Sequence, residues 1–170
     1  MIMGMSISTF TLVHVVLSLV GILAGLVVVF GMFSSKKLDG WTALFLATTV
    51  LTSVTGFFFP FDKILPSHIV GIVSLVVLAI AIVALYALHL AGPWRWLYVV
   101  SAVLALYLNV FVGVVQAFQK LPLLAPLAPT QAEPPFLIAQ AVVLVIFIVL
   151  GVVAVRSFRP PADVPVSSAV

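Results

Sequence analysis

The feature that most constrains the fold is an uncharged apolar run from Pro66 to Leu88. It contains no Asp, Glu, Lys or Arg, and it exceeds the roughly 20 residues that a helix needs to cross the hydrocarbon core of a bilayer. Backbone polar groups in hydrocarbon must be hydrogen-bonded within the protein, and a helix achieves this within one segment. The run therefore predicts a transmembrane helix.

The composition extends this prediction to the rest of the chain. Of the 170 residues, 65% are hydrophobic and 6% are charged, whereas soluble domains have about 25% charged residues. So few charges cannot cover a water-exposed surface, and lipid must therefore contact most of it. We expect one all-α domain over residues 1–158, a polytopic membrane helix bundle, followed by a flexible cytoplasmic tail over residues 159–170.

Five apolar stretches are candidates for the membrane spans. They cover residues 10–33, 41–59, 66–90, 97–118 and 136–155. The 41–59 stretch is rich in threonine, so we expect five transmembrane helices, or four if this stretch does not cross. Residues 119–135 between the last two spans hold five prolines, which exclude a continuous helix. Their leucines favour a segment on the bilayer surface, a lid over the bundle or a re-entrant loop.

The basic residues predict the orientation of the bundle. With five spans, one side of the membrane receives Lys36, Lys37, Arg95, Arg156 and Arg159, and the other receives Lys63 and Lys120. Cytoplasmic segments carry the excess of Lys and Arg. We therefore expect the N-terminus outside and the C-terminus in the cytoplasm.

Polar residues from separate spans fall at a similar depth in the outer half of this arrangement. Such side chains are costly in hydrocarbon unless they are paired or hydrated. We therefore expect a polar cavity open to the outer face, whose ligand would be a small apolar molecule. The candidate binding residues are His14, Ser18, Thr52, Thr55, His68, Asn109, Gln116, Lys120 and Gln140.

The two outer histidines also allow a cofactor hypothesis. His14 and His68 could be the axial ligands of one haem b, as in a single-haem cytochrome of electron transport. His89 has no partner histidine with which to ligate a second haem. The absence of cysteine excludes covalently attached haem. The alternatives are that these imidazoles are satisfied by hydroxyls, amides or water, or that they contact a quinone or a metal.

Several function classes have little support in the sequence. No carboxylate lies inside a predicted span, so no catalytic acid–base pair or proton relay is visible and we predict no catalytic residue. The basic residues are scattered and form no nucleic-acid-binding face. We expect a non-enzymatic ligand-binding protein or an accessory subunit of a membrane complex, with possible self-association. The alternatives are the haem protein and a small transporter or channel.

Two stretches carry a resemblance. Residues 55–71, TGFFFPFDKILPSHIVG, and residues 108–136, LNVFVGVVQAFQKLPLLAPLAPTQAEPPF, resemble segments of a small bacterial inner-membrane family. This resemblance implies a multi-pass protein of the bacterial cell membrane.

Overall fold

The computed structural model describes residues 2, 4–60 and 66–160, and the regular structure in this part of the chain is helical. The α-helices are α1 (Ile7–Phe33), α2 (Asp39–Gly56), α3 (Pro66–Ile82), α4 (Trp94–Lys120) and α5 (Pro134–Ser157). A π-helix, η1 (Val83–Ala87), continues α3, and a 3₁₀-helix, η2 (Ala125–Leu127), lies between α4 and α5.

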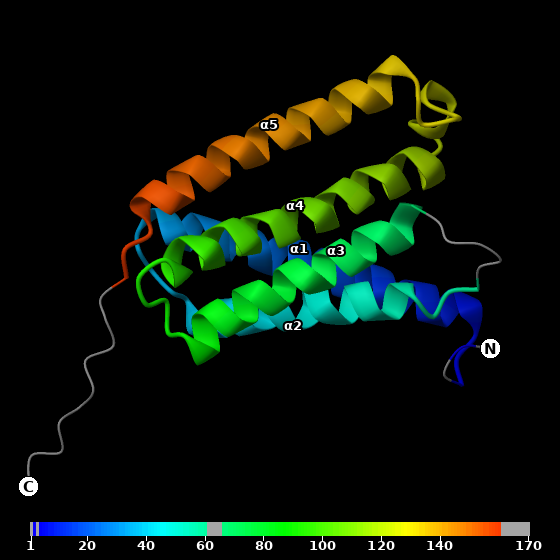
Figure 1. The fold of residues 1–170 in the computed structure, drawn as a ribbon. Coiled ribbons are helices and arrows are strands. Elements are labelled where there is room, and N and C mark those ends of the chain that lie inside the picture. Colours follow the sequence, from blue (N-terminus) through cyan, green and yellow to red (C-terminus); the bar gives the residue numbers. More distant parts are fainter. Residues whose placement is uncertain (1, 3, 61–65, 161–170) are drawn as a thin grey trace, which may run out of the picture.

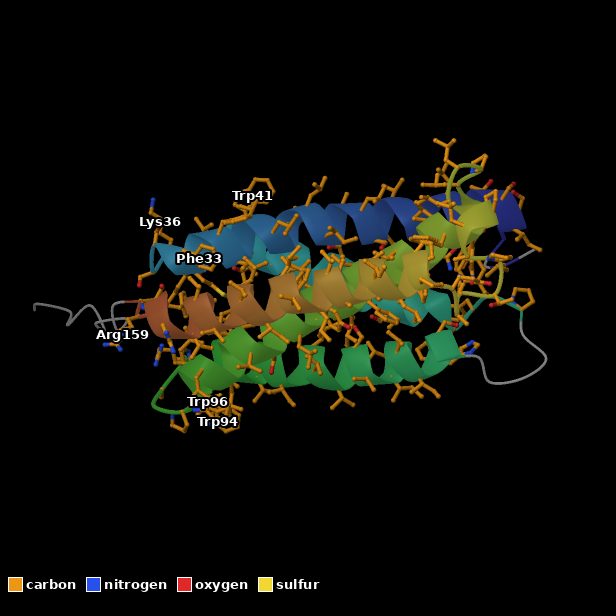
Figure 2. All side chains as sticks on the ribbon, turned by 90° about the horizontal axis from the view of Figure 1, so that it is seen from above. Phe33, Lys36, Trp41, Trp94, Trp96 and Arg159 are labelled. Carbon is orange, nitrogen blue, oxygen red and sulfur yellow. The ribbon has the colours of Figure 1, made fainter. Side chains whose placement is uncertain are left out.

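The helices form a bundle whose members alternate in direction along the chain (Figure 1). α1, α3 and α5 run one way, and α2 and α4 run back. We call the end that carries the N-terminus and the 121–133 loop the loop end. We call the opposite end the basic end, because it carries Lys36, Lys37, Arg95, Arg156 and Arg159. Figure 2 shows Lys36 and Arg159 there, with Trp94 and Trp96 nearby.

In the part of the chain that the structure describes, four helices are long and apolar enough to cross a membrane. They are Ile7–Phe33, Ser67–Ala87, Trp94–Lys120 and Pro134–Ser157. Their length and composition agree with the predicted multi-pass membrane protein. α2 is not among them, because Asp39 and a run of threonines make it more polar. Its 18 residues rise about 27 Å, slightly less than the roughly 30 Å of a hydrocarbon core.

The core lies around α4, which packs against α1, α3 and α5. Tyr98, Val99, Ala102 and Leu106 of α4 are fully buried, as is Phe45 of α2. Large aliphatic side chains cover the outside of the bundle, for example on α1 and α5. A bilayer favours such an apolar exterior, since lipid tails are as apolar as leucine.

The predicted third span differs from the observed helix at its end. The sequence suggested a helix to residue 90, but α3 ends at Ile82 and η1 follows. The Leu88 N–H donates to the Val83 carbonyl at 3.0 Å, which is the i to i−5 spacing of a π-helix. A tight turn comes next, in which His89, Leu90 and Gly92 have positive φ values of 48°, 59° and 52°.

The proline-rich loop packs on the ends of the helices that it joins. Ala128 is buried with Phe118 of α4 and Phe136 of α5 in a small apolar cluster. Leu123 is 87% exposed, so the loop also presents an apolar side chain outward. Lys63, which the sequence predicts on the same side of the membrane as this loop, lies outside the described residues. The predicted tail from residue 161 onward also lies outside them.

Candidate functional site

The deepest polar contact joins α1 to α4. The Ser18 hydroxyl donates to Asn109 Oδ1 at 2.7 Å, and Asn109 Nδ2 lies 3.4 Å from the Ser18 carbonyl. Asn109 is buried, so its amide faces protein, as its position in the middle of a span requires. These two predicted site residues are therefore brought together.

Gly21 lets a third helix reach the same point. A Cβ at Gly21 would lie 3.0 Å from Thr49 Oγ1, 3.1 Å from Thr48 Oγ1 and 3.2 Å from Asn109 Nδ2. The hydroxyls of Thr48 and Thr49 donate to carbonyls of their own helix, so their oxygens can still accept hydrogen bonds. The group Ser18, Gly21, Thr48, Thr49 and Asn109, which we call the central junction, is a compact polar contact among α1, α2 and α4.

A second contact lies nearer the loop end, where His14 of α1 meets the last turn of α2. His14 Nδ1 lies 2.8 Å from Thr55 Oγ1. When the Thr55 hydroxyl donates its single proton to the Leu51 carbonyl, which lies 2.7 Å from Oγ1, the Nδ1–H of His14 donates to Thr55. The Phe59 ring packs edge-on against the imidazole, with ring centroids 5.2 Å apart.

This hydrogen bond determines which ring nitrogen of His14 can meet a ligand. With the proton on Nδ1, a neutral imidazole carries its lone pair on Nε2. Nε2 makes no hydrogen bond to the described residues, and the side chain is only half-buried. Lys120, the last residue of α4, is exposed at the same end of the bundle. His14 and Lys120 therefore offer one acceptor and one donor at the loop end.

His68 occupies a different contact, between α2 and α3. It is buried, and its ring lies against Phe57 with centroids 5.7 Å apart. One helical turn before Phe57, Ser53 Oγ of α2 lies 3.1 Å from Ser74 Oγ of α3. A Cβ at Gly71 would meet the Phe57 ring at 3.1 Å, so α3 is tightly packed against this face of α2.

The two histidines thus contact different residues at the C-terminal end of α2. His14 packs on Thr55 of the last turn and on Phe59 beyond it, whereas His68 packs on Phe57, the C-cap residue. Residues two apart on a helix point about 200° away from each other, and Thr55 and Phe57, whose backbone is still helical, are two apart. An axial pair of haem ligands must face each other across one iron, and this arrangement does not supply that geometry. Among the described residues, no group of three or more His, Cys, Asp or Glu could hold a metal ion.

The remaining predicted residues are dispersed. The Thr52 hydroxyl donates to the Thr48 carbonyl. Gln140 of α5 donates to the Phe111 carbonyl of α4 at 3.2 Å, while its Oε1 is buried without a partner among the described residues. Gln116 is exposed. The structure therefore divides the predicted single cluster into separate contacts along the bundle.

A cavity of about 420 Å³ lies under the 121–133 loop. Its lining residues are Phe118, Gln119, Ala125, Ala128, Pro129, Thr130 and Gln131. The predicted site residues do not line it. Sequence reasoning also missed Phe57 and Phe59 as partners of the histidines, although the aromatic run before Pro60 was a signal for them.

Over residues 4–60 and 66–160, the fold is a helical bundle with four helices long and apolar enough to span a membrane. Comparison of the chain with protein-family models, with curated proteins and with solved structures finds no match.

Proposed function

We propose that the chain is a non-enzymatic integral membrane protein that binds a small, mainly apolar molecule from the bilayer at the loop end. The observation that carries this proposal is the state of His14, whose Nδ1 is fixed by Thr55 while Nε2 has no partner among the described residues. A polar side chain within the hydrocarbon region is costly unless it is paired or hydrated. A half-buried imidazole with a lone pair left over is suited to accept a hydrogen bond from a ligand.

The chemistry of the site narrows the kind of molecule. Nε2 of His14 can accept from a hydroxyl, and Lys120 can donate to a carbonyl or another oxygen. The surroundings are apolar, with Phe59 and Phe10 in edge contact at 5.1 Å. A ring or chain with a hydroxyl that can donate to Nε2 and a second oxygen that can accept from Lys120 fits these features, and a quinol is one example.

We also propose that α2 crosses the membrane as a fifth span, with the N-terminus outside and the C-terminus in the cytoplasm. α1 and α3 run in the same direction (Figure 1), so the chain between them must return across the thickness of the bundle. The basic end carries the larger number of Lys and Arg, which supports a cytoplasmic location for that end. This arrangement places His14 in the outer half of the membrane.

The test begins with protein extracted gently from its native membrane into lipid nanodiscs. Mass spectrometry of the extracted small molecules should identify a co-purified compound with an oxygen group. A short-chain quinol, kept reduced, serves as the titration probe because its hydroxyl can donate to Nε2. His14→Ala should weaken its binding about tenfold, since the loss of one hydrogen bond costs about 1 kcal/mol or slightly more, and Lys120→Gln should weaken it by a similar factor.

His89→Ala is the matched control, because His89 is exposed and lies in the turn at the basic end. Equal binding by the His14 and His89 variants would contradict the proposal. An absorption spectrum of the purified protein tests the haem alternative in the same preparation. A Soret band that both His14→Ala and His68→Ala abolish would replace the present proposal by that alternative.

A further inference from the structure

An apolar groove runs along the contact between α4 and α5 in the half of the bundle nearest the basic end. Its volume is about 430 Å³, and both helices line it. Tyr107 and Phe147 form an aromatic wall, with ring centroids 5.7 Å apart. Gly151 lies opposite Val103, where an added Cβ would be 3.6 Å from Val103 Cγ1. Because Gly151 has no side chain, the groove has room for a chain of methylene groups.

The groove has one charged residue, Arg156, in the last turn of α5. Its side chain is exposed, and no carboxylate of the described residues pairs with it. The nearby Arg95 has a different role, because its Nη1 donates to the carbonyls of Val155 and Phe158 at the end of α5. Arg95 therefore satisfies the helix end, and the guanidinium of Arg156 remains available at the mouth of the groove.

We propose that this groove binds an anionic phospholipid, with one acyl chain along the apolar walls and the phosphate at Arg156. Charge complementarity supports this occupant over a neutral helix of a partner protein, because the one charge in the groove lining is an exposed guanidinium, which attracts an anion. Arginine binds phosphate through two parallel hydrogen bonds. Basic pockets between transmembrane helices on the cytoplasmic side are a recurrent site for anionic lipid head groups.

The experiment compares phosphatidylglycerol with phosphatidylcholine of the same acyl chains. The full chain is reconstituted in nanodiscs that hold equal amounts of the two lipids, and native mass spectrometry counts the lipids retained after partial delipidation. The wild type should retain the anionic lipid preferentially. Arg156→Gln should lower this preference about fivefold, the factor expected for one basic residue near a charged membrane surface.

Two further variants separate the site from general attraction. Arg159→Gln removes one charge at the same end without touching the groove, and it should keep the wild-type preference. Gly151→Leu leaves the charges unchanged but fills the groove, so it should reduce retention of both lipids, and circular dichroism should confirm that it remains helical. If Arg159→Gln lowers the preference as much as Arg156→Gln, or if Gly151→Leu retains lipid as the wild type does, the proposal is wrong.

Discussion

At the residue scale, the polar side chains of this protein mainly connect helices to one another. Ser18 bonds Asn109, His14 bonds Thr55, and Ser53 contacts Ser74. Each pair comes from two different helices, so each bond fixes the position of one helix against another. Hydrogen bonds of this kind within membranes are modest in strength, averaging about 0.6 kcal/mol.

The central junction gives the first prediction at this scale. Asn109→Ala should lower the free energy of unfolding by ~1 kcal/mol, because it removes a buried amide and leaves the Ser18 hydroxyl without its acceptor. A double-mutant cycle with Ser18→Ala, measured by reversible unfolding in mixed micelles, should give a coupling of about 0.6 kcal/mol. Gln116→Ala, at an exposed amide on the same helix, is the control and should have little effect. Additive losses for Ser18 and Asn109 would show that the bond is not formed.

At the element scale, a charged residue, Glu133, holds the turn that precedes α5. Glu133 precedes the helix, and its Oε1 accepts from the Thr130 hydroxyl at 2.8 Å and from the Thr130 N–H at 3.1 Å. Its Oε2 accepts from the Ala132 N–H at 3.1 Å. Desolvation favours the neutral acid, but the hydrogen bonds from Thr130 and Ala132 outweigh it and lower the pKa of Glu133.

This lowered pKa has a consequence for pH. A carboxyl whose pKa is lower in the folded protein stabilises the fold above its unfolded pKa and loses that contribution as pH falls through the folded value. The turn at residues 130–133 should therefore loosen in acid, below the usual range of Glu. In nuclear magnetic resonance spectra recorded in nanodiscs, the chemical shift of the Thr130 amide should change as the pH falls through the lowered pKa of Glu133. In Glu133→Gln the shift should disappear, and a titration that persists there would contradict the assignment.

The elements themselves were largely predictable, because long apolar runs, prolines and tryptophans mark the ends of membrane helices in the sequence. The arrangement of the candidate site was less predictable from the sequence. Depth along a span follows from residue number, and on this basis His14 and His68 were expected at a similar level. The face that each histidine presents depends on how the helices are rotated. Thr55 and Phe59 lie against His14, whereas Phe57 lies against His68. Hydropathy does not encode this rotation, so the predicted single cavity became several separate contacts.

At the scale of the whole molecule, the five-span arrangement predicts which ends of the helices reach each aqueous side. The chain has no cysteine, so single cysteines can be added without background. Leu123→Cys, in the exposed part of the loop, should react with a membrane-impermeant maleimide on intact cells. Gly40→Cys, in the first turn of α2 where an added Cβ meets no neighbour, should react only after permeabilisation.

Phe58→Cys provides the control for α2, because Phe58 is exposed just beyond the opposite end of that helix. It should behave like Leu123→Cys. Labelling of Gly40→Cys and Phe58→Cys from the same side would show that α2 does not cross the membrane and that the chain has four spans.

The hydroxyl-rich character of α2 has a consequence for how the protein is made. The hydroxyls of residues such as Thr48, Thr49 and Ser53 donate hydrogen bonds to carbonyls of their own helix. Even so, α2 is less apolar than α1, α3, α4 and α5. Such a segment would partition poorly into lipid when it emerges alone from the ribosome. α2 makes its most extensive contact with α1, which is synthesised first. We therefore expect α2 to enter the bilayer together with α1, as a helical hairpin.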